Sequence, residues 1–164
     1  MTPTSPAAQP APAKACIGHV HLRVADLDRA IGFYSGVLGF DVMQRGPQAA
    51  FLAAGGYHHH IGLNTWESLG AMPPPPGHTG LYHTAFLYPS RADLAEAVRR
   101  VQAAGIPITG KADHGVSEAV YLSDPDGNGV ELYRDKPAEE WPVDAQDRLA
   151  MVNAPLDLEA LTAS

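Results

Sequence analysis

The stretch Ile17-Gly18-His19-Val20-His21-Leu22-Arg23-Val24 alternates apolar and polar side chains with a period of two. Its apolar side chains share one face, and the other face holds His19, His21 and Arg23. This period predicts a strand with one buried face. The polar face is either solvated or turned toward a site. The second interpretation is favoured because later segments repeat the pattern, each with a titratable or amide side chain opposite the apolar face.

The order strand, helix and three strands occurs twice along the chain. In the first half we expect a strand at residues 17–24, a helix capped by Asp26, and strands at Phe40–Met43, Ala49–Ala53 and His58–Trp66. In the second half we expect a strand at Leu81–Tyr88, a helix capped by Ser90, and strands at Ile106–Thr109, Ala119–Ser123 and Gly129–Arg134. The sequence therefore predicts an α+β fold made of two βαβββ modules.

A proline-rich connector divides the two modules. Residues 67–80 contain Pro73-Pro74-Pro75-Pro76, a stiff run that donates no backbone hydrogen bonds to a sheet. We expect one domain over residues 16–142, with module one at 16–66 and module two at 81–136. Residues 1–15, rich in Pro and Ala, read as a disordered lead-in. Residues 143–164 form a tail that either covers a face of the domain or stays loose, with one or two helical turns at Asp157–Thr162.

The composition narrows the classes of function. The 164 residues carry a net charge of −7, which disfavours nucleic acid as a partner. We see no apolar run of the length that a membrane helix needs. Cys16 is the single cysteine, so no intrachain disulfide is expected and the cytoplasm is the default location. Eight histidines stand out in a chain of this length.

The polar faces of the expected strands carry side chains suited to metal chemistry. If the apolar faces all pack beneath the helices, the opposite faces converge in one concave site. That site would hold His19, His21, His60, His83, Tyr121 and Glu131. Two neutral imidazoles and a carboxylate suit a divalent transition metal and leave coordination positions open. The alternative is ordinary: hydrogen-bonded histidines on strands and a glutamate on the surface.

The run from His19 to Leu27, together with Phe33-Tyr34 and Leu38-Gly39-Phe40, resembles the opening of the vicinal oxygen chelate superfamily. That superfamily includes glyoxalase I, fosfomycin and bleomycin resistance proteins, and extradiol ring-cleavage dioxygenases. Residues 81–85 and 124–133 resemble its second half. Among its members, the chain is most similar to catechol 2,3-dioxygenase-like proteins. The implied fold is a pair of βαβββ modules whose mixed sheets curl around a metal-binding cleft.

The resemblance also implies a ligand set. By position, the metal ligands are His19, His83 and Glu131, and we expect them to meet around one cation. His21 shares the face of His19 but does not occupy the ligand position, and we do not expect His78 in the connector to be a ligand. Glyoxalase I has a further glutamate on the fourth strand, where this chain has His60-Ile61-Gly62-Leu63-Asn64. This difference favours the three-ligand set of extradiol dioxygenases.

In those enzymes a further histidine acts as acid and base beside the metal, and His60 resembles it. His114 and Tyr121 resemble a histidine and a tyrosine that bond substrate oxygens. The implied activity is ring cleavage of a catechol-like aromatic by O2 on Fe(II), with Mn(II), Zn(II) or Ni(II) as other metals. The alternatives are a glyoxalase-like isomerase, lyase or transferase, and a drug-binding protein without catalysis. The site is complete in one chain or is shared across a homodimer.

Overall fold

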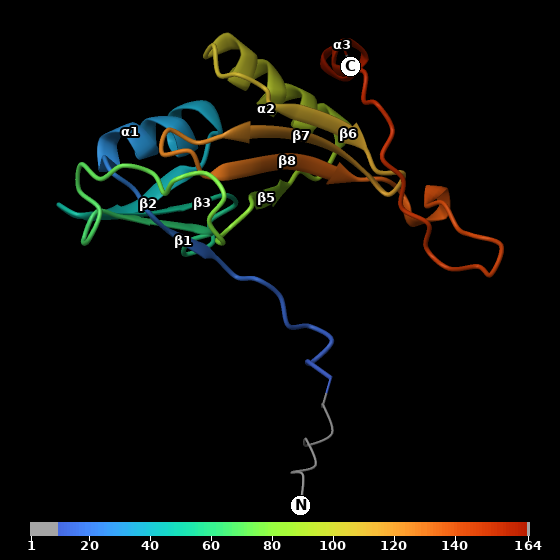
Figure 1. Cartoon of the computed structure of the whole chain (residues 1–164), viewed down its shortest axis with the longest axis horizontal. Helices are drawn as coiled ribbons and strands as arrows, with labels where there is room; N and C mark the ends of the chain where they lie inside the picture. The colour runs from blue at the N-terminus through green and yellow to red at the C-terminus, as the bar shows by residue number, and fades with distance from the viewer. Residues whose placement is uncertain (1–9, 164) are drawn as a thin grey trace, which may run out of the picture.

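The computed structural model describes residues 10–163, and its strands form two separate sheets (Figure 1). The first sheet has the order β1-β4-β3-β2, with β1 at Val20–Arg23, β2 at Asp41–Arg45, β3 at Ala49–Ala53 and β4 at Ile61–Asn64. The second has the order β5-β8-β7-β6, with β5 at Thr84–Leu87, β6 at Gly110–Asp113, β7 at Ser117–Ser123 and β8 at Gly129–Asp135. The predicted lead-in lies mostly outside the described residues.

The two sheets share one topology. In each sheet the first strand of the module pairs in parallel with the last, as β1 does with β4 and β5 with β8. The remaining neighbours pair antiparallel. This repeat confirms the predicted α+β fold of two βαβββ units, and neither sheet closes into a barrel.

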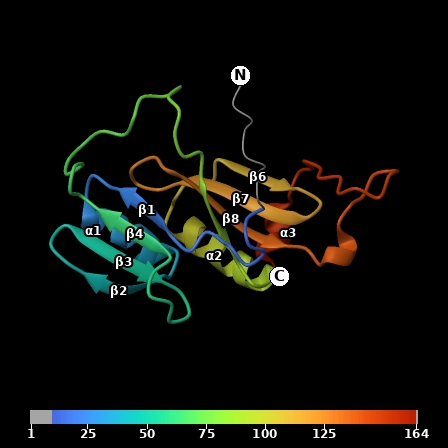
Figure 2. The ribbon, with the colours of Figure 1, turned by 90° about the horizontal axis from the view of Figure 1, so that it is seen from below.

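Both module helices begin where the sequence places a capping side chain. Asp26 accepts the backbone N–H of Arg29 at the start of α1 (Leu27–Ile31), and Ser90 accepts that of Asp93 at the start of α2 (Arg91–Ala103). The first helix continues as a π-helix, η1 (Gly32–Val37). Figures 1 and 2 show α1 and α2 on the same side of the two sheets. No helix of residues 10–163 covers the opposite face of either sheet, which is called the helix-free face below.

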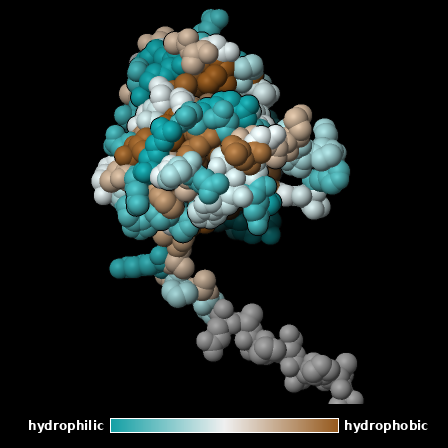
Figure 3. Space-filling view, turned by 90° about the vertical axis from the view of Figure 1, so that its left-hand side faces the viewer, coloured by the Kyte–Doolittle hydropathy of each residue, from teal (hydrophilic) through white to brown (hydrophobic). Residues whose placement is uncertain are grey.

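The two modules share one apolar core. It joins Tyr34 and Leu38 of module one to Leu94, Val98 and Leu132 of module two. Several large apolar side chains outside this core stay exposed, among them Met43, Trp66, Tyr82 and Leu87. Figure 3, which views the end of the molecule nearest module one, shows hydrophobic patches among polar side chains.

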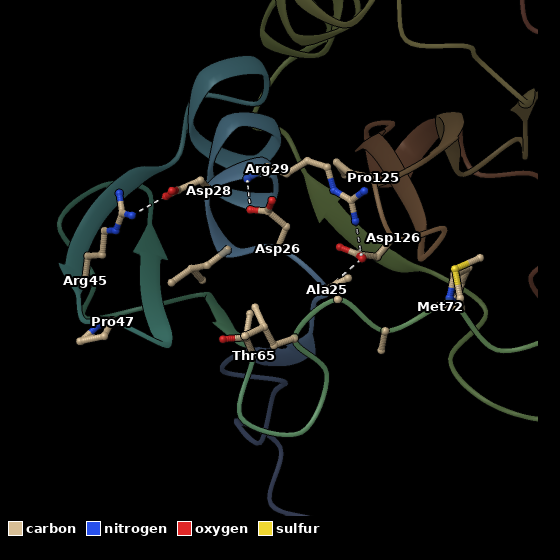
Figure 4. Close-up of a pocket in the computed structure, with 15 residues that line it drawn as sticks. Ala25, Asp26, Asp28, Arg29, Arg45, Pro47, Thr65, Met72, Pro125 and Asp126 are labelled. Carbon is tan, nitrogen blue, oxygen red and sulfur yellow. Dashed lines mark hydrogen bonds and ion pairs between the residues drawn. The ribbon is translucent and has the colours of Figure 1, made fainter.

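The turn between β7 and β8 fastens module two to module one. The Tyr34 hydroxyl donates to the buried Asp124 carboxylate at 2.9 Å. Asp126 accepts hydrogen bonds from the Ala25 backbone at 3.0 Å and from Arg29 at 2.7 Å (Figure 4). These contacts border a cavity of about 710 Å³, whose lining contains none of the predicted site residues.

Two strands begin later than the sequence pattern predicts. β4 begins at Ile61 and not at His58, because the turn at Gly55-Gly56, where both φ angles are positive, leads directly into the histidines. β6 begins at Gly110 and not at Ile106. Residues 106–109 carry the chain from the end of α2 to the sheet, and Ile106 and Ile108 pack on the core without pairing in a ladder.

The C-terminal tail covers α2. Its helix α3 (Leu158–Thr162), which confirms the predicted helical turns, buries Leu161, and the preceding Leu156 is also buried. Arg91 and Arg99 on α2 donate to the carbonyls of Ala160 and Thr162. A short 3₁₀ helix, η2 (Ala138–Glu140), begins the path from β8 to the tail. No helix within residues 10–163 is long and apolar enough to cross a membrane.

The contact between Tyr34 and Asp124 predicts a large loss of stability in Tyr34→Phe. Burial, followed by the neighbouring Asp124 carboxylate, raises the pKa of Tyr34, so the phenol stays protonated and donates. Removing a buried donor to a charged acceptor costs about 1.5–3 kcal/mol. Urea denaturation should show this loss, while Tyr57→Phe, at a tyrosine that is 41% exposed and lies outside the core, should stay within about 0.5 kcal/mol of the parent. Equal midpoints for the two variants would contradict the contact.

Candidate functional site

His83 and Glu131 meet on the helix-free face of the second sheet. The parallel register pairs Ala85 of β5 with Glu131 of β8, and His83 stands just before β5. The His83 Nε2 atom lies 2.9 Å from Glu131 Oε2. The Glu131 side chain is only 12% exposed, and the buried His83 Nδ1 has no hydrogen-bond partner within residues 10–163. The imidazole, 31% exposed, and the more deeply buried carboxylate thus form a pair that solvent reaches mainly from the His83 side.

Tyr121 continues this pair on the next strand. It stands directly opposite Glu131 in the register of β7 and β8, and its hydroxyl donates to Glu131 Oε1 at 3.1 Å. Burial, and then the Glu131 carboxylate, raise the pKa of Tyr121 to about 12. The phenol therefore keeps its proton at neutral pH and fixes one oxygen of the carboxylate.

His114, in the connection between β6 and β7, contacts Tyr121. Its Nε2 lies 2.8 Å from the Tyr121 hydroxyl, and its Nδ1 lies 3.3 Å from the carbonyl oxygen of Val152. The single hydroxyl proton of Tyr121 goes to Glu131, so in the contact with His114 the Tyr121 oxygen accepts and Nε2 donates. The tail thus contacts a predicted site residue, for which the local sequence gives no signal.

The donors of module two fit a divalent metal. Two ligand atoms at right angles on a metal, each about 2.1 Å from it, lie about 3 Å apart. The separation of His83 and Glu131 agrees with this geometry, and a hydrogen bond from Tyr121 orients the carboxylate. Within residues 10–163 of one chain, however, no group of three His, Cys, Asp or Glu side chains could hold a metal. Two of the three predicted ligands come together and His19 does not join them.

His19 lies on the first sheet, among other aromatic rings. Its ring centroid lies 4.5 Å from that of His59, which also packs on Phe51 at 5.2 Å. Partial burial, and then repulsion from His19 and His58, lower the pKa of His59. His21 lies between Phe51 and Trp66, above Gly62, where a Cβ atom would come within 2.8 Å of its ring. This glycine leaves room for an imidazole on the helix-free face.

The histidine that packs against His19 is His59. The expected strand at His58–Trp66 would instead have placed His60 on the same face of the sheet as His19. Because β4 begins at Ile61, the alternation does not extend back through the three histidines. The His60 ring packs on Tyr57 at 4.7 Å, and its Nδ1 accepts the Ala54 N–H at 3.3 Å. The turn at Gly55-Gly56, just before the three histidines, indicates that the strand starts later than His58, and this signal could have identified His59 as the neighbour of His19. His78 contacts the Pro75 carbonyl in the connector.

A pocket of about 500 Å³ opens beside the module-two residues. Its volume falls within the range of small-molecule sites. It is lined by His83, His114 and Tyr121, by Tyr82 just before β5, and by Asn153 from the tail. An organic ligand in this pocket would lie directly against the imidazole of His83 and the phenol of Tyr121.

Comparison with known proteins links this fold and site to one family. The family described as the Glyoxalase/Bleomycin resistance protein/Dioxygenase superfamily matches residues 16–132. A catechol-2,3-dioxygenase of Bacillus subtilis is 41% identical over 145 residues, covering 88% of this chain and 50% of that protein. A biphenyl-2,3-diol 1,2-dioxygenase of Rhodococcus globerulus is 34% identical, covering 73% of this chain and 63% of that protein. The chain thus spans half to two thirds of the length of these relatives.

A solved structure of lactoylglutathione lyase from Agrobacterium tumefaciens superimposes with a TM-score of 0.59. It is 30% identical, and the alignment covers 75% of this chain and 95% of that one. The chain is therefore similar both to proteins named as dioxygenases and to a protein named as a lyase.

The environment of Tyr121 predicts a late alkaline titration. In metal-free protein, the tyrosinate absorbance that Tyr121→Phe removes should have its midpoint near pH 12, against about 10 for an ordinary tyrosine. Because the folded pKa is raised, the protonated phenol stabilises the fold below pH 10. This contribution is lost as the pH rises toward 12. Glu131→Gln should move the midpoint down only in part, since burial is the larger cause. A midpoint near 10 in the parent protein would contradict this geometry.

Proposed function

The chain belongs to the glyoxalase/bleomycin resistance protein/dioxygenase superfamily, and from this membership we propose that it is a metal-dependent extradiol-type dioxygenase acting on a catechol-like aromatic. The observation that supports this most directly is the connected series His83, Glu131, Tyr121 and His114, of which His83, Tyr121 and His114 line a pocket. The similarity to relatives named for cleaving catechol and biphenyl diols supports the same reaction.

The proposed metal is Fe(II), with His19, His83 and Glu131 as its ligands. When bound, iron would supply open positions for two vicinal hydroxyls and O2. The protein groups act around it. The Tyr121 phenol, with its raised pKa, keeps its proton and donates to a substrate oxygen or to Glu131. His114, whose Nε2 contacts the Tyr121 hydroxyl, is proposed to bond a substrate oxygen. His60 is proposed as a further acid and base from the resemblance alone.

We further propose that two copies of the chain complete each site. One chain brings His83 and Glu131 together, and the described residues of that chain offer no third ligand. His19 stands exposed beside His59 on the first sheet, and the exposed Trp66 packs on the neighbouring His21. Apposing this face to module two of a second copy would bury Trp66 and supply the missing imidazole. The proposed location is the cytoplasm.

The second candidate is a glyoxalase-like isomerase or lyase, which the similarity to lactoylglutathione lyase favours. Such an enzyme needs no O2. Against it stands β4, where Ile61, Gly62, Leu63 and Asn64 provide no carboxylate for a fourth ligand. Binding without catalysis is the third candidate, and the donor pair His83 and Glu131 argues against it.

Ring cleavage is tested on protein loaded with Fe(II) under anaerobic conditions. Catechols should then be converted to yellow ring-opened products with matching O2 uptake, and His83→Ala and Glu131→Gln should each lower kcat/KM at least about 100-fold through loss of metal. Arg148→Ala, at an ion pair in the tail, is the control and should keep full activity. An iron-loaded protein that takes up no O2 with any catechol would reject the dioxygenase, and turnover of a thiol adduct without O2 would favour the second candidate.

A site shared between two copies predicts complementation. His19→Ala and His83→Ala should each be inactive alone. In a refolded equimolar mixture, the mixed dimer carries one intact site and one doubly altered site, so about a quarter of the parent activity should return. His19→Ala mixed with the double variant His19→Ala/His83→Ala should recover nothing. Failure of the first mixture to regain activity, with mixed dimers present by mass spectrometry, would show that one chain supplies all the ligands.

A further inference from the structure

We propose that Asn153, from the C-terminal tail, is a specificity-determining residue that binds an oxygen function on a ring substituent of the substrate. This inference rests on the proposed function, because it assumes an aromatic diol at His83 and Glu131. It assigns a role to a segment outside both βαβββ modules.

The tail is held against the sheet as an extra short strand. β6 is the edge strand of the second sheet, and its free side carries residues 152–154. Asp113 and Ala154 exchange two backbone hydrogen bonds, at 2.9 and 2.8 Å, and the Val152 N–H donates to the His114 carbonyl at 3.0 Å. The side chain of Val152 also packs over Gly115. Asn153 lies between these anchors, so its backbone is fixed before any ligand arrives.

The pairing also fixes the direction of the Asn153 side chain. Ala154 is opposite Asp113, so alternation along the tail places Asn153 on the face of β6 that carries Ala112. Ala112 pairs with Ala119, which shares its face of β7 with Tyr121. This is the helix-free face, and Asn153 lines the pocket there together with His83, His114 and Tyr121.

The Asn153 amide is available to a ligand. Within the described part of the chain its side chain has no hydrogen-bond partner, and it is exposed. An amide offers both donors and an acceptor. Hydroxyl, carbonyl and carboxylate oxygens are therefore all suitable partners, whereas a purely apolar substituent gains nothing from this contact.

The spacing of the strands limits which part of the substrate reaches Asn153. From β8, which carries Glu131, to the tail there are three strand spacings of about 4.8 Å each. This span is wider than one aromatic ring. A catechol whose hydroxyls lie at His83 and Glu131 ends near Tyr121 and His114, and only a side chain on the ring continues to Asn153. The substrate class is thus a catechol with a short substituent ending in oxygen.

A matched pair of ligands tests this inference. Calorimetry on anaerobic Zn(II)-loaded protein would compare 4-(3-hydroxypropyl)catechol with 4-butylcatechol, which differ only in a terminal hydroxyl or methyl group. We expect the parent to bind the alcohol about fivefold to tenfold more tightly and Asn153→Ala to lose this preference. Unsubstituted catechol should bind both proteins equally. Gln102→Ala, which truncates an exposed amide on α2 behind the sheet, should keep the parent's preference.

The same three proteins would then be assayed with Fe(II) and O2, where the ratio of kcat/KM values for the two substituted catechols should change in parallel. Equal affinity of the parent for the two ligands, an unchanged preference in Asn153→Ala, or no binding of either ligand would overturn the role of Asn153. Absence of ring opening with a preserved difference in affinity would reject the dioxygenase alone and leave Asn153 as a determinant of binding.

Discussion

The buried carboxylate of Asp124 is the contact on which the arrangement of the two modules depends. A buried charge is tolerated only when its oxygens are hydrogen-bonded. Asp124 accepts from the Tyr34 hydroxyl, from the backbone of Asp126 and Asn128, and from the Asn128 side chain. This set ties η1 of module one to the turn that begins β8. Since β8 carries Glu131, the same carboxylate that joins the modules also sets the starting point of the strand that bears a candidate ligand.

Because both module helices lie on one side of the sheets, the apolar core lies on that side and the candidate site residues lie on the helix-free face. The core side is closed by apolar packing from both modules. On the other side, parallel pairing of the outer strand with the last strand brings His83 beside Glu131. The equivalent position in the first sheet brings His19 and His21 beside the turn that holds His59. Each module would therefore supply part of the proposed ligand set, and the proposed pairing of two copies would bring the two parts together.

The parts of the fold that local chemistry determines follow from the sequence. The predicted strand at Ala49–Ala53 has the same first and last residues as β3 in the structure. Asp26 and Ser90 cap the two module helices as expected. Tyr121 contacts both Glu131 and His114, so three of the residues named from the resemblance lie together, while their roles stay a prediction. Other features depend on partners far along the chain. The turn before β4 changes which histidine meets His19, and the tail pairs with β6 through backbone groups, which leave no pattern in side chains.

The pairing of the tail with β6 has a consequence for how the protein behaves in solution. An uncovered edge strand presents free N–H and C=O groups that can recruit strands from other molecules and nucleate aggregates. Here the chain's own residues 152–154 occupy that edge. The segment that contributes Asn153 to the pocket therefore also covers part of the β6 edge, where a strand of another molecule could otherwise pair. Because the pairing uses backbone groups, a side-chain substitution at Asn153 would leave it intact, whereas a change that prevents the pairing would expose the edge of β6.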